Sequence, residues 1–297
     1  MIKRTLEISN PAYLKAHKQQ LIIEKEREVV ASVPFEDLGV LLLSHPQIVL
    51  TQAVIAACHE VNVVIIHCSS KYLPISLTQP IAFHSLHTKT LREQIALSTV
   101  RQKQLWQQIV IEKIHQQLHT LSRFGKTHTE IERLAKSVHS GDKHNHEAQA
   151  AQKYWKTLMG KDFHRDFEET GVNQLLNYGY AIIRAAVARA IVKTGFHPSL
   201  GLNHHNQYNS FCLADDLMEP FRPWVDEITL NQQSHHLNQE TKANYLQVLA
   251  TDVLFKERHM PFMVALDYFV ALVKQAYQDK TIQLEFPQRL SKADGDD

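Results

Sequence analysis

The first seventy residues alternate short apolar runs with polar turns, a pattern typical of β-strands. Strands are predicted at residues 5–8, 20–26, 29–34, 38–44 and 63–69, which read TLEI, QLIIEKE, VVASVP, LGVLLLS and VVIIHCS. The fourth and fifth runs are almost wholly apolar, which indicates strands buried on both faces. Between them, Thr51 is a favourable N-cap for QAVIAACHEV, so a helix is expected over residues 52–61.

From about residue 88 to residue 278 the apolar positions recur at helical intervals. A helical stretch is predicted over residues 91–118, with an apolar set of Leu91, Ile95, Leu105, Ile109 and Ile114. A second helix is predicted within residues 141–159, with an apolar face of Ala148, Ala151 and Trp155.

Two more helices are expected towards the C-terminus. Residues 173–195 are almost uniformly apolar, which predicts a central buried helix that ends at Gly195. Residues 261–277 have an amphipathic pattern, with Pro261 allowed in the first turn.

These patterns predict an α+β protein, with a small β-rich N-terminal domain followed by a larger all-α domain. The β-rich domain is assigned to residues 1–75 and the helical domain to residues 88–285. Residues 76–87 are predicted to be a linker, because the sequence from Lys71 to His87 contains Pro74 and Pro80 and shows no helical periodicity. Residues 286–297, which end in SKADGDD, are predicted to be a disordered tail.

Composition is that of an ordinary soluble protein, with 297 residues, 21% of them charged, and a formal net charge of +1. Cys58, Cys68 and Cys212 form no CxxC pair and no even disulfide framework, so a reducing, cytoplasmic setting is expected. The first residues lack the apolar core of a signal peptide, and a run of about 18 apolar residues that could span a bilayer is missing. No membrane association is therefore expected.

Several common catalytic signatures are missing from the sequence. Gly125-Lys126-Thr127 resembles the end of a phosphate-binding loop, but Thr120 stands where that loop needs a glycine. GxGxxG, GxSxG and a His-Asp dipeptide do not occur, and His146-Glu147 has no second histidine at the zincin spacing. Phosphate chemistry through a nucleotide-binding loop is therefore disfavoured.

Three carboxylates crowd into the short segment from Asp215 to Glu219, although residues 170–214 contain none. If Asp216 and Glu219 lie on one helix, closed by the prolines that follow, their i, i+3 spacing puts both on one face. Oxygen ligands of this kind suit a hard divalent cation.

A histidine beside such carboxylates shifts the preference of the site from Mg²⁺ towards Mn²⁺, and His204 and His205 lie just upstream. The same cluster also fits a solvated acidic face, or a simple ion pair between Asp216 and Arg222. Spacing alone leaves these interpretations open.

Three segments together resemble the spacer-acquisition integrase of CRISPR immune systems, most closely its type II branch. They are GDKHNHEAQAAQKYW at residues 141–155, LLNYGYAII at residues 175–183 and GLNHHNQYNSFCLADDLMEPFRPWVD at residues 201–226. The resemblance covers most of the chain, because a β-rich domain, a linker and a helical domain follow in the family's order. It implies that the larger, all-α domain is the catalytic domain.

The resemblance also implies a divalent metal site with three ligands. The glutamate of the EAxAA motif falls on Glu147, the histidine of the GLNH segment on His204, and the acidic residue that closes DLME on Glu219. Asp216 would be a supporting carboxylate. His205 stays a second candidate, because only the spacing from the glycine favours His204.

The family resemblance implies that this protein is a Mn²⁺- or Mg²⁺-dependent integrase, which inserts short captured DNA duplexes into a CRISPR repeat array. In this reaction a 3′-hydroxyl attacks a phosphodiester, and no covalent enzyme intermediate is needed. The implied partners are double-stranded DNA, a second copy of the chain and a small ferredoxin-like CRISPR-associated protein in a heterohexameric complex. In type II systems the RNA-guided effector nuclease is a further implied partner.

A DNA substrate needs cations against its backbone. Residues 89–126 hold seven Lys or Arg against two Glu, so this region is a candidate DNA-binding surface; a solvated helix face is the alternative. The candidate DNA contacts are Lys89, Arg92, Arg101, Lys103, Arg184 and Arg189.

Two other functions compete with integration. A metal-dependent endonuclease acting on branched DNA would use the same site with water as the nucleophile. A non-catalytic DNA-binding scaffold would pair its acidic cluster with arginines and need no metal.

Overall fold

The computed structural model describes residues 4–69, 74–78, 84–166 and 168–290. The N-terminal strands are β1 Arg4–Ile8, β2 Tyr13–His17, β3 Gln20–Lys25, β4 Glu28–Pro34, β5 Leu38–Leu43, β6 Val49–Leu50, β7 Val64–Cys68 and β8 Pro74–Thr78, and α1 is Gln52–Glu60. The later helices are α2 His87–Ala96, α3 Thr99–Arg123, α4 Thr129–Ser137, α5 His146–Met159, α6 Val172–Lys193, α7 Cys212–Met218, α8 Arg222–Leu230, α9 Gln239–Gln247 and α10 Phe262–Gln278. Short 3₁₀ turns are η1 Phe35–Asp37, η2 Glu219–Phe221 and η3 Val248–Ala250, and the last strands are β9 Asp252–Phe255, β10 Arg258–Pro261 and β11 Gln288–Arg289.

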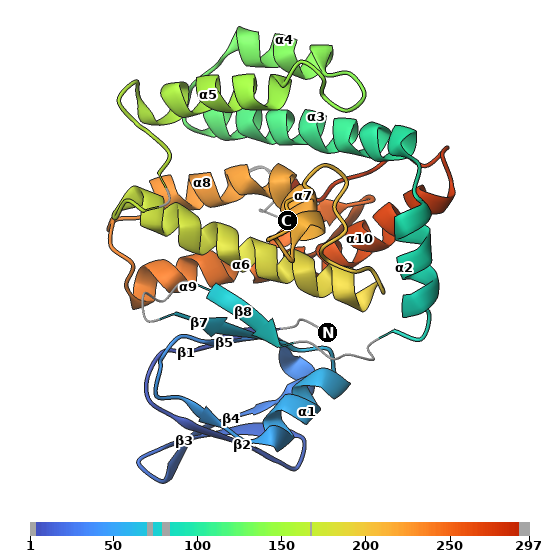
Figure 1. The fold of residues 1–297 in the computed structure, drawn as a ribbon. Coiled ribbons are helices and arrows are strands. Elements are labelled where there is room, and N and C mark those ends of the chain that lie inside the picture. The colour runs from blue at the N-terminus through green and yellow to red at the C-terminus, as the bar shows by residue number, and fades with distance from the viewer. Residues whose placement is uncertain (1–3, 70–73, 79–83, 167, 291–297) are drawn as a thin grey trace.

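Two four-stranded sheets build the N-terminal part (Figure 1). One sheet has the order β4-β3-β2-β6, and β2, β3 and β4 are antiparallel neighbours within it. The other has the order β1-β5-β7-β8, in which β1, β5 and β7 are parallel and β8 is antiparallel to β7. The second sheet lies between the first sheet and the helices, so it must be apolar on both faces.

Strand β5 shows this two-sided burial directly. All six of its residues are buried. Val40 and Leu42 belong to the core that the sheet shares with the helices, whereas Leu41 and Leu43 belong to the separate core of the N-terminal part. Because side chains alternate along a strand, a continuous apolar run can supply both cores at once.

Helix α6 runs through the centre of the helical part (Figure 1), where it contacts α7, α8, α9 and α10. It is long and apolar enough to cross a membrane by composition, but 83% of its most apolar window is buried inside the protein. The predicted central buried helix is therefore confirmed as a core helix. Helices α3, α4 and α5 form a layer on the far side of α8 from the sheets, and α3 packs against α4, α5, α8 and η2.

The predicted fold class is confirmed: strands dominate up to β8 and helices dominate after it. One departure is a three-stranded sheet of order β10-β9-β11 within the helical part. Strand β11 and the buried Phe286 also fall inside the predicted disordered tail, so residues 286–290 are ordered. The rest of that tail, residues 291–297, lies outside the described residues.

The predicted linker and the first predicted helical stretch also differ in detail. Strand β8 occupies residues 74–78 and so overlaps the start of the linker, whereas residues 79–83 lie outside the described part of the chain. The stretch 91–118 is split between α2 and α3, because the Ser98 hydroxyl accepts a hydrogen bond from the Arg101 amide and starts a new helix. Ile95, at the end of α2, is consequently 70% exposed.

Gly179 on α6 gives a test of this packing. A Cβ added there would lie 2.4 Å from Val225 Cγ1 and 2.7 Å from Tyr245 Cδ1, both of which belong to buried residues. We expect Gly179→Ala to lower the free energy of unfolding by about 1–3 kcal/mol, as overpacked core substitutions do. Urea denaturation measures the change, with Gln174→Ala on the same helix as the control. A variant as stable as wild type would contradict the close packing of α6 against α8 and α9.

Candidate functional site

The acidic segment of the sequence forms the end of α7 and the turn η2. Asp216 is inside α7, and Glu219 follows the last residue of α7 with helical dihedral angles of φ −51° and ψ −43°. Pro220 lies in η2 and Pro223 in the first turn of α8, so Pro223 begins the next helix instead of closing α7. Helix α3 contacts both η2 and α8, so side chains from either element can face it.

Glu147 reaches the same place from the first turn of α5. The carboxylate of Asp142 accepts hydrogen bonds from the amides of His146 and Glu147, both at 2.9 Å, and so caps this helix. The buried face of α5 consists of Ala150, Tyr154 and Leu158. The predicted face of Ala148, Ala151 and Trp155 was wrong at Ala148, which is exposed, whereas Ala151 and Trp155 are half-buried and Trp155 packs against the main core. Glu147 lies three residues before Ala150, on the side of α5 that meets α3.

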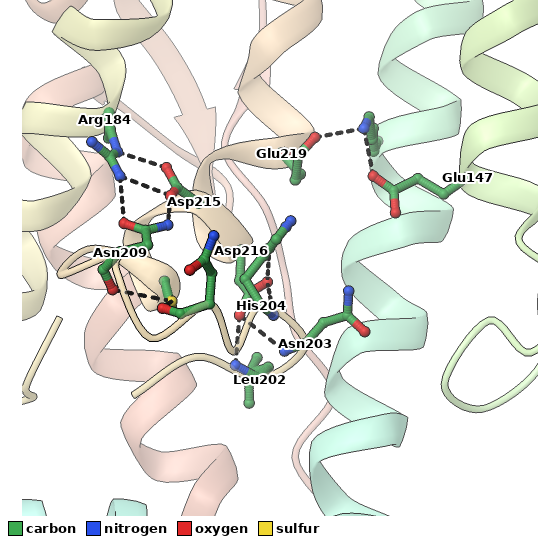
Figure 2. A network of polar contacts seen from close by, with 12 residues as sticks. Glu147, Arg184, Leu202, Asn203, His204, Asn209, Asp215, Asp216 and Glu219 are labelled. Atoms are coloured by element: carbon green, nitrogen blue, oxygen red, sulfur yellow. Dashed lines mark hydrogen bonds and ion pairs between the residues drawn. The ribbon is translucent and has the colours of Figure 1, made fainter. Parts of the chain in front are cut away.

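A lysine on α3 joins the two glutamates. Lys113 Nζ lies 2.6 Å from Glu147 Oε1 and 2.5 Å from Glu219 Oε2 (Figure 2, dashed lines from each glutamate to one ammonium). The side chains of Lys113, Glu147 and Glu219 are 12%, 22% and 6% exposed. Burial alone would favour the neutral amine, but the two carboxylates outweigh it and raise the pKa of Lys113 above its ordinary value.

Arg222 completes the cationic surroundings of Glu219. Its Nε lies 2.7 Å from Glu219 Oε1, and its guanidinium lies over the ring of Tyr180 at 4.8 Å from the centroid. Burial would raise the pKa of Glu219, but the charges of Arg222 and Lys113 outweigh burial and lower that pKa to about 2. Glu219 therefore stays ionised at neutral pH.

Asp216 organises the loop that carries His204. Its Oδ2 accepts hydrogen bonds from the amides of Leu202 and Asn203, at 2.5 and 3.0 Å, and its Oδ1 accepts one from the amide of His204 at 3.2 Å. Asp216 Oδ1 is also 2.6 Å from His204 Nδ1, and the Asp216 residue is fully buried. This hydrogen bond raises the pKa of His204 against the opposing effect of burial. Nε2 is then the ring nitrogen that can meet a ligand.

Asp215 points away from Asp216 and has a different partner (Figure 2). Arg184 donates from Nε to Asp215 Oδ1 at 2.6 Å and from an Nη to Oδ2 at 2.8 Å, and Asn209 donates to Oδ2 at 2.6 Å. Two adjacent aspartates are thus separated by their partners: one binds an arginine, and the other binds backbone amides and a histidine.

The described residues contain no group of three or more His, Cys, Asp or Glu side chains already arranged as metal ligands. Lys113 takes the position between the two glutamates, and Asp216 holds His204. The donor chemistry nevertheless fits a divalent cation. Two carboxylates already share one cation, because Lys113 Nζ contacts an oxygen of both Glu147 and Glu219. A histidine held by a carboxylate through Nδ1 is the usual arrangement of a metal-binding histidine.

The candidate DNA contacts fall into two groups. Arg101 is 3% exposed and donates to the carbonyls of Ala276, Asp279 and Ile282, and Arg189 is 5% exposed and pairs with Asp267. Both arginines hold the fold together and have little surface to offer to DNA. Arg184 is committed to Asp215 and Asn209. The exposed members of the set are Lys89, Arg92 and Lys103.

Three residues of this site were not predicted from the sequence: Lys113, Asp142 and Arg222, the last of which was considered only as a partner of Asp216. Lys113 carried a usable signal. On α3, Trp106, Val110, Lys113, Gln117 and Thr120 follow one another at intervals of four and three residues, and all of them except Lys113 are buried. A lysine within a buried stripe needs an acidic partner, because an unpaired buried charge is costly.

Both the sequence and the fold of this chain have relatives among known proteins. Residues 8–257 match the sequence model of the family described as CRISPR associated protein Cas1. The chain is 34% identical over 298 residues to the CRISPR-associated endonuclease Cas1 of Neisseria meningitidis serogroup C (strain 8013), and the match covers 98% of this chain and 97% of that relative.

Two solved structures share the fold. A casposase bound to integration product superposes with a TM-score of 0.77 at 18% identity, covering 99% of this chain and 97% of that chain. A Cas6-RT-Cas1–Cas2 complex superposes with a TM-score of 0.74 at 17% identity, covering 98% of this chain and 36% of that chain. At these identities the likeness concerns the fold.

The different partners of the two aspartates give a test. We expect Asp216→Asn to lower the free energy of unfolding by about 2 kcal/mol or more, because an amide supplies one acceptor oxygen where the buried carboxylate serves three backbone amides and an imidazole. Asp215→Asn, which keeps an acceptor for the half-exposed Arg184, should cost less than half as much. Urea denaturation of both variants in chelator measures the difference, and equal losses would contradict the assigned roles.

Proposed function

This chain belongs to the Cas1 family of CRISPR-associated proteins, and from that membership we propose that it is a divalent-metal-dependent DNA integrase. In this proposal it inserts short captured duplexes, the spacers, into a CRISPR repeat array as part of antiviral defence. The observation that supports the proposal best is the meeting of Glu147 and Glu219 at a single cation. His204, which Asp216 fixes, is close enough to Glu219 for that charge to help raise the pKa of the imidazole.

The proposed ligands are Glu147, His204 and Glu219, with Mn²⁺ or Mg²⁺ as the ion. When bound, such an ion supplies the positive charge that activates an attacking hydroxyl and offsets charge on the reacting phosphate. Asp216 keeps His204 Nδ1 occupied and so presents Nε2. Arg222 keeps Glu219 ionised and in place through its contact with Oε1.

The reaction itself is an exchange of phosphodiester bonds. The 3′-oxygen of the captured duplex forms a bond to phosphorus at the edge of a repeat, and the bond from that phosphorus to the 3′-oxygen of the repeat strand breaks. The attacking hydroxyl loses a proton and the leaving oxygen gains one. No enzyme side chain becomes covalently attached in this scheme, so the site needs only to hold and orient its reactants.

Exposed cations on α2 and α3 are proposed to bind the DNA backbone. Lys89 and Arg92 on α2 and Lys103 on α3 are exposed and belong to the basic region of the sequence. Arg101, Arg184 and Arg189 are left out of this surface because their guanidinium groups are engaged within the chain.

The proposed partners are double-stranded DNA, a second copy of the chain and a small ferredoxin-like protein of the Cas2 kind in a heterohexameric complex. The fold is shared with a complex whose description includes both Cas1 and Cas2, which supports the Cas2 partner. An RNA-guided effector nuclease is a further proposed partner. The three cysteines are free thiols, in keeping with the cytoplasmic setting that we propose.

Hydrolysis of branched DNA is a second candidate function. The Neisseria relative is named an endonuclease, and the same ligands could activate water in place of a 3′-hydroxyl. A DNA-binding scaffold is the third candidate, in which Lys113 and Arg222 would be permanent partners of the glutamates.

Strand joining tests the proposal. We expect Glu147→Ala, His204→Ala and Glu219→Ala each to lower Mn²⁺-dependent joining of a labelled duplex to a plasmid by at least about hundredfold, because each removes a proposed ligand. Asp216→Asn, which loosens His204 without removing it, should lower joining by about tenfold. The neighbouring His205→Ala is the matched control and should be much milder than His204→Ala.

The products separate the candidates. Labelled DNA joined to the plasmid indicates integration, whereas nicks alone indicate hydrolysis and would overturn the proposal. A protein that shows neither metal-dependent activity nor stabilisation by divalent metal would favour the scaffold. If Glu147→Ala joins DNA at a rate near that of wild type, the ligand assignment is wrong.

A further inference from the structure

Lys113 occupies the position that the proposed metal ion needs. Its ammonium touches one oxygen of each glutamate, at 2.6 and 2.5 Å, and it does so on a side chain that is only 12% exposed. An ion at ordinary ligand distances of about 2.0–2.6 Å from the same two oxygens would lie at or directly beside the position of Nζ. Two cations cannot share that space, since both contact repulsion and charge oppose it.

The local charges balance without a metal. Glu147 and Glu219 carry two negative charges, and Lys113 and Arg222 carry two positive charges. Adding a divalent ion to this set would leave two uncompensated positive charges in a largely buried place, which is unfavourable. Release of one cation to solvent is the simplest way to reduce the excess.

Of the two cations, Lys113 is the one that can leave. Arg222 is fixed from two sides, by its contact with Glu219 Oε1 and by its position over the ring of Tyr180. The contacts found for the Lys113 ammonium within the described residues are the two carboxylates themselves. Its four-carbon stem is flexible, so rotation can carry the charge away from the site while α3 stays in place.

We propose that Lys113 is an internal counter-ion that holds Glu147 and Glu219 together in the metal-free protein and is displaced when a divalent ion binds them. The inference rests on the proposed metal-dependent function and adds a second role for the same carboxylates. The lysine prevents the two carboxylates from repelling each other before metal arrives. It also weakens metal binding, because every binding event must first break two ion pairs that are largely shielded from solvent.

Calorimetric titration of metal-stripped protein with MnCl₂ tests the exchange. Lys113→Met removes the competing charge but keeps a side chain of similar length. We therefore expect the affinity of this variant for Mn²⁺ to be at least about tenfold higher than that of wild type. The free energy of a tenfold change is a modest share of what the two ion pairs of Lys113 contribute. Lys113→Arg keeps the charge and binds carboxylates through a fork, so its affinity should fall. Lys136→Met, an exposed lysine on α4, is the matched control and should bind Mn²⁺ as wild type does.

Thermal unfolding supplies a second readout that does not depend on activity. In EDTA, Lys113→Met should unfold at a lower temperature than wild type, and saturating Mn²⁺ should raise its midpoint by more than it raises that of wild type. Should Lys113→Met fold poorly, the opposite sign expected for Lys113→Arg keeps the test decisive.

The outcomes distinguish this inference from the proposed function. If Glu147→Gln abolishes Mn²⁺ binding but Lys113→Met leaves the affinity unchanged or lower, the metal site stands and the counter-ion role is wrong. If wild-type protein binds no Mn²⁺ at this site and Lys113→Met does not restore binding, both proposals fail.

Discussion

The contact of one ammonium with two carboxylates is the interaction on which the site depends. Lys113 on α3 draws together Glu147 from the start of α5 and Glu219 from η2, three segments far apart in the sequence. Burial would favour the neutral form of Glu219, but the charges of Arg222 and Lys113 outweigh burial and lower the pKa of that carboxyl. The helical layer of α3, α4 and α5 is therefore positioned against α7, η2 and α8 by charge as well as by apolar packing.

The carboxylate of Asp216 positions the third proposed ligand, His204. Asp216 is buried among backbone amides, so its charge shapes a loop and orients His204. Asp215 pairs with Arg184, so each of the three neighbouring carboxylates has a different role. One carboxylate faces the shared cation, one fixes the histidine, and one ties α7 to α6. Like charges can lie so close together because each has its own positive or hydrogen-bonding partner.

Much of the fold could be predicted from the sequence where a pattern reports burial directly. Strand β5 is wholly buried and β7 and the long helix α6 are largely buried, as their apolar composition predicts. The apolar face of α5 was placed wrongly at Ala148, because alanines and a tryptophan occur around that helix and tertiary contacts select among them. Arg101 and Arg189 could not be told from surface arginines, because their partners lie far away along the chain. The two partners of Lys113 could not be identified for the same reason, because only the folded chain brings them together with it.

Glu147 and Glu219 hold one cation, and we infer that a divalent ion takes the place of Lys113 there. The decisive experiment is a crystal structure of the protein soaked in Mn²⁺, with anomalous scattering recorded to locate the ion. We expect an anomalous peak bound by oxygens of Glu147 and Glu219 and by His204 Nε2, with the Lys113 side chain turned away. A fully soaked crystal with no peak there, or with Lys113 still between the two glutamates, would contradict this inference.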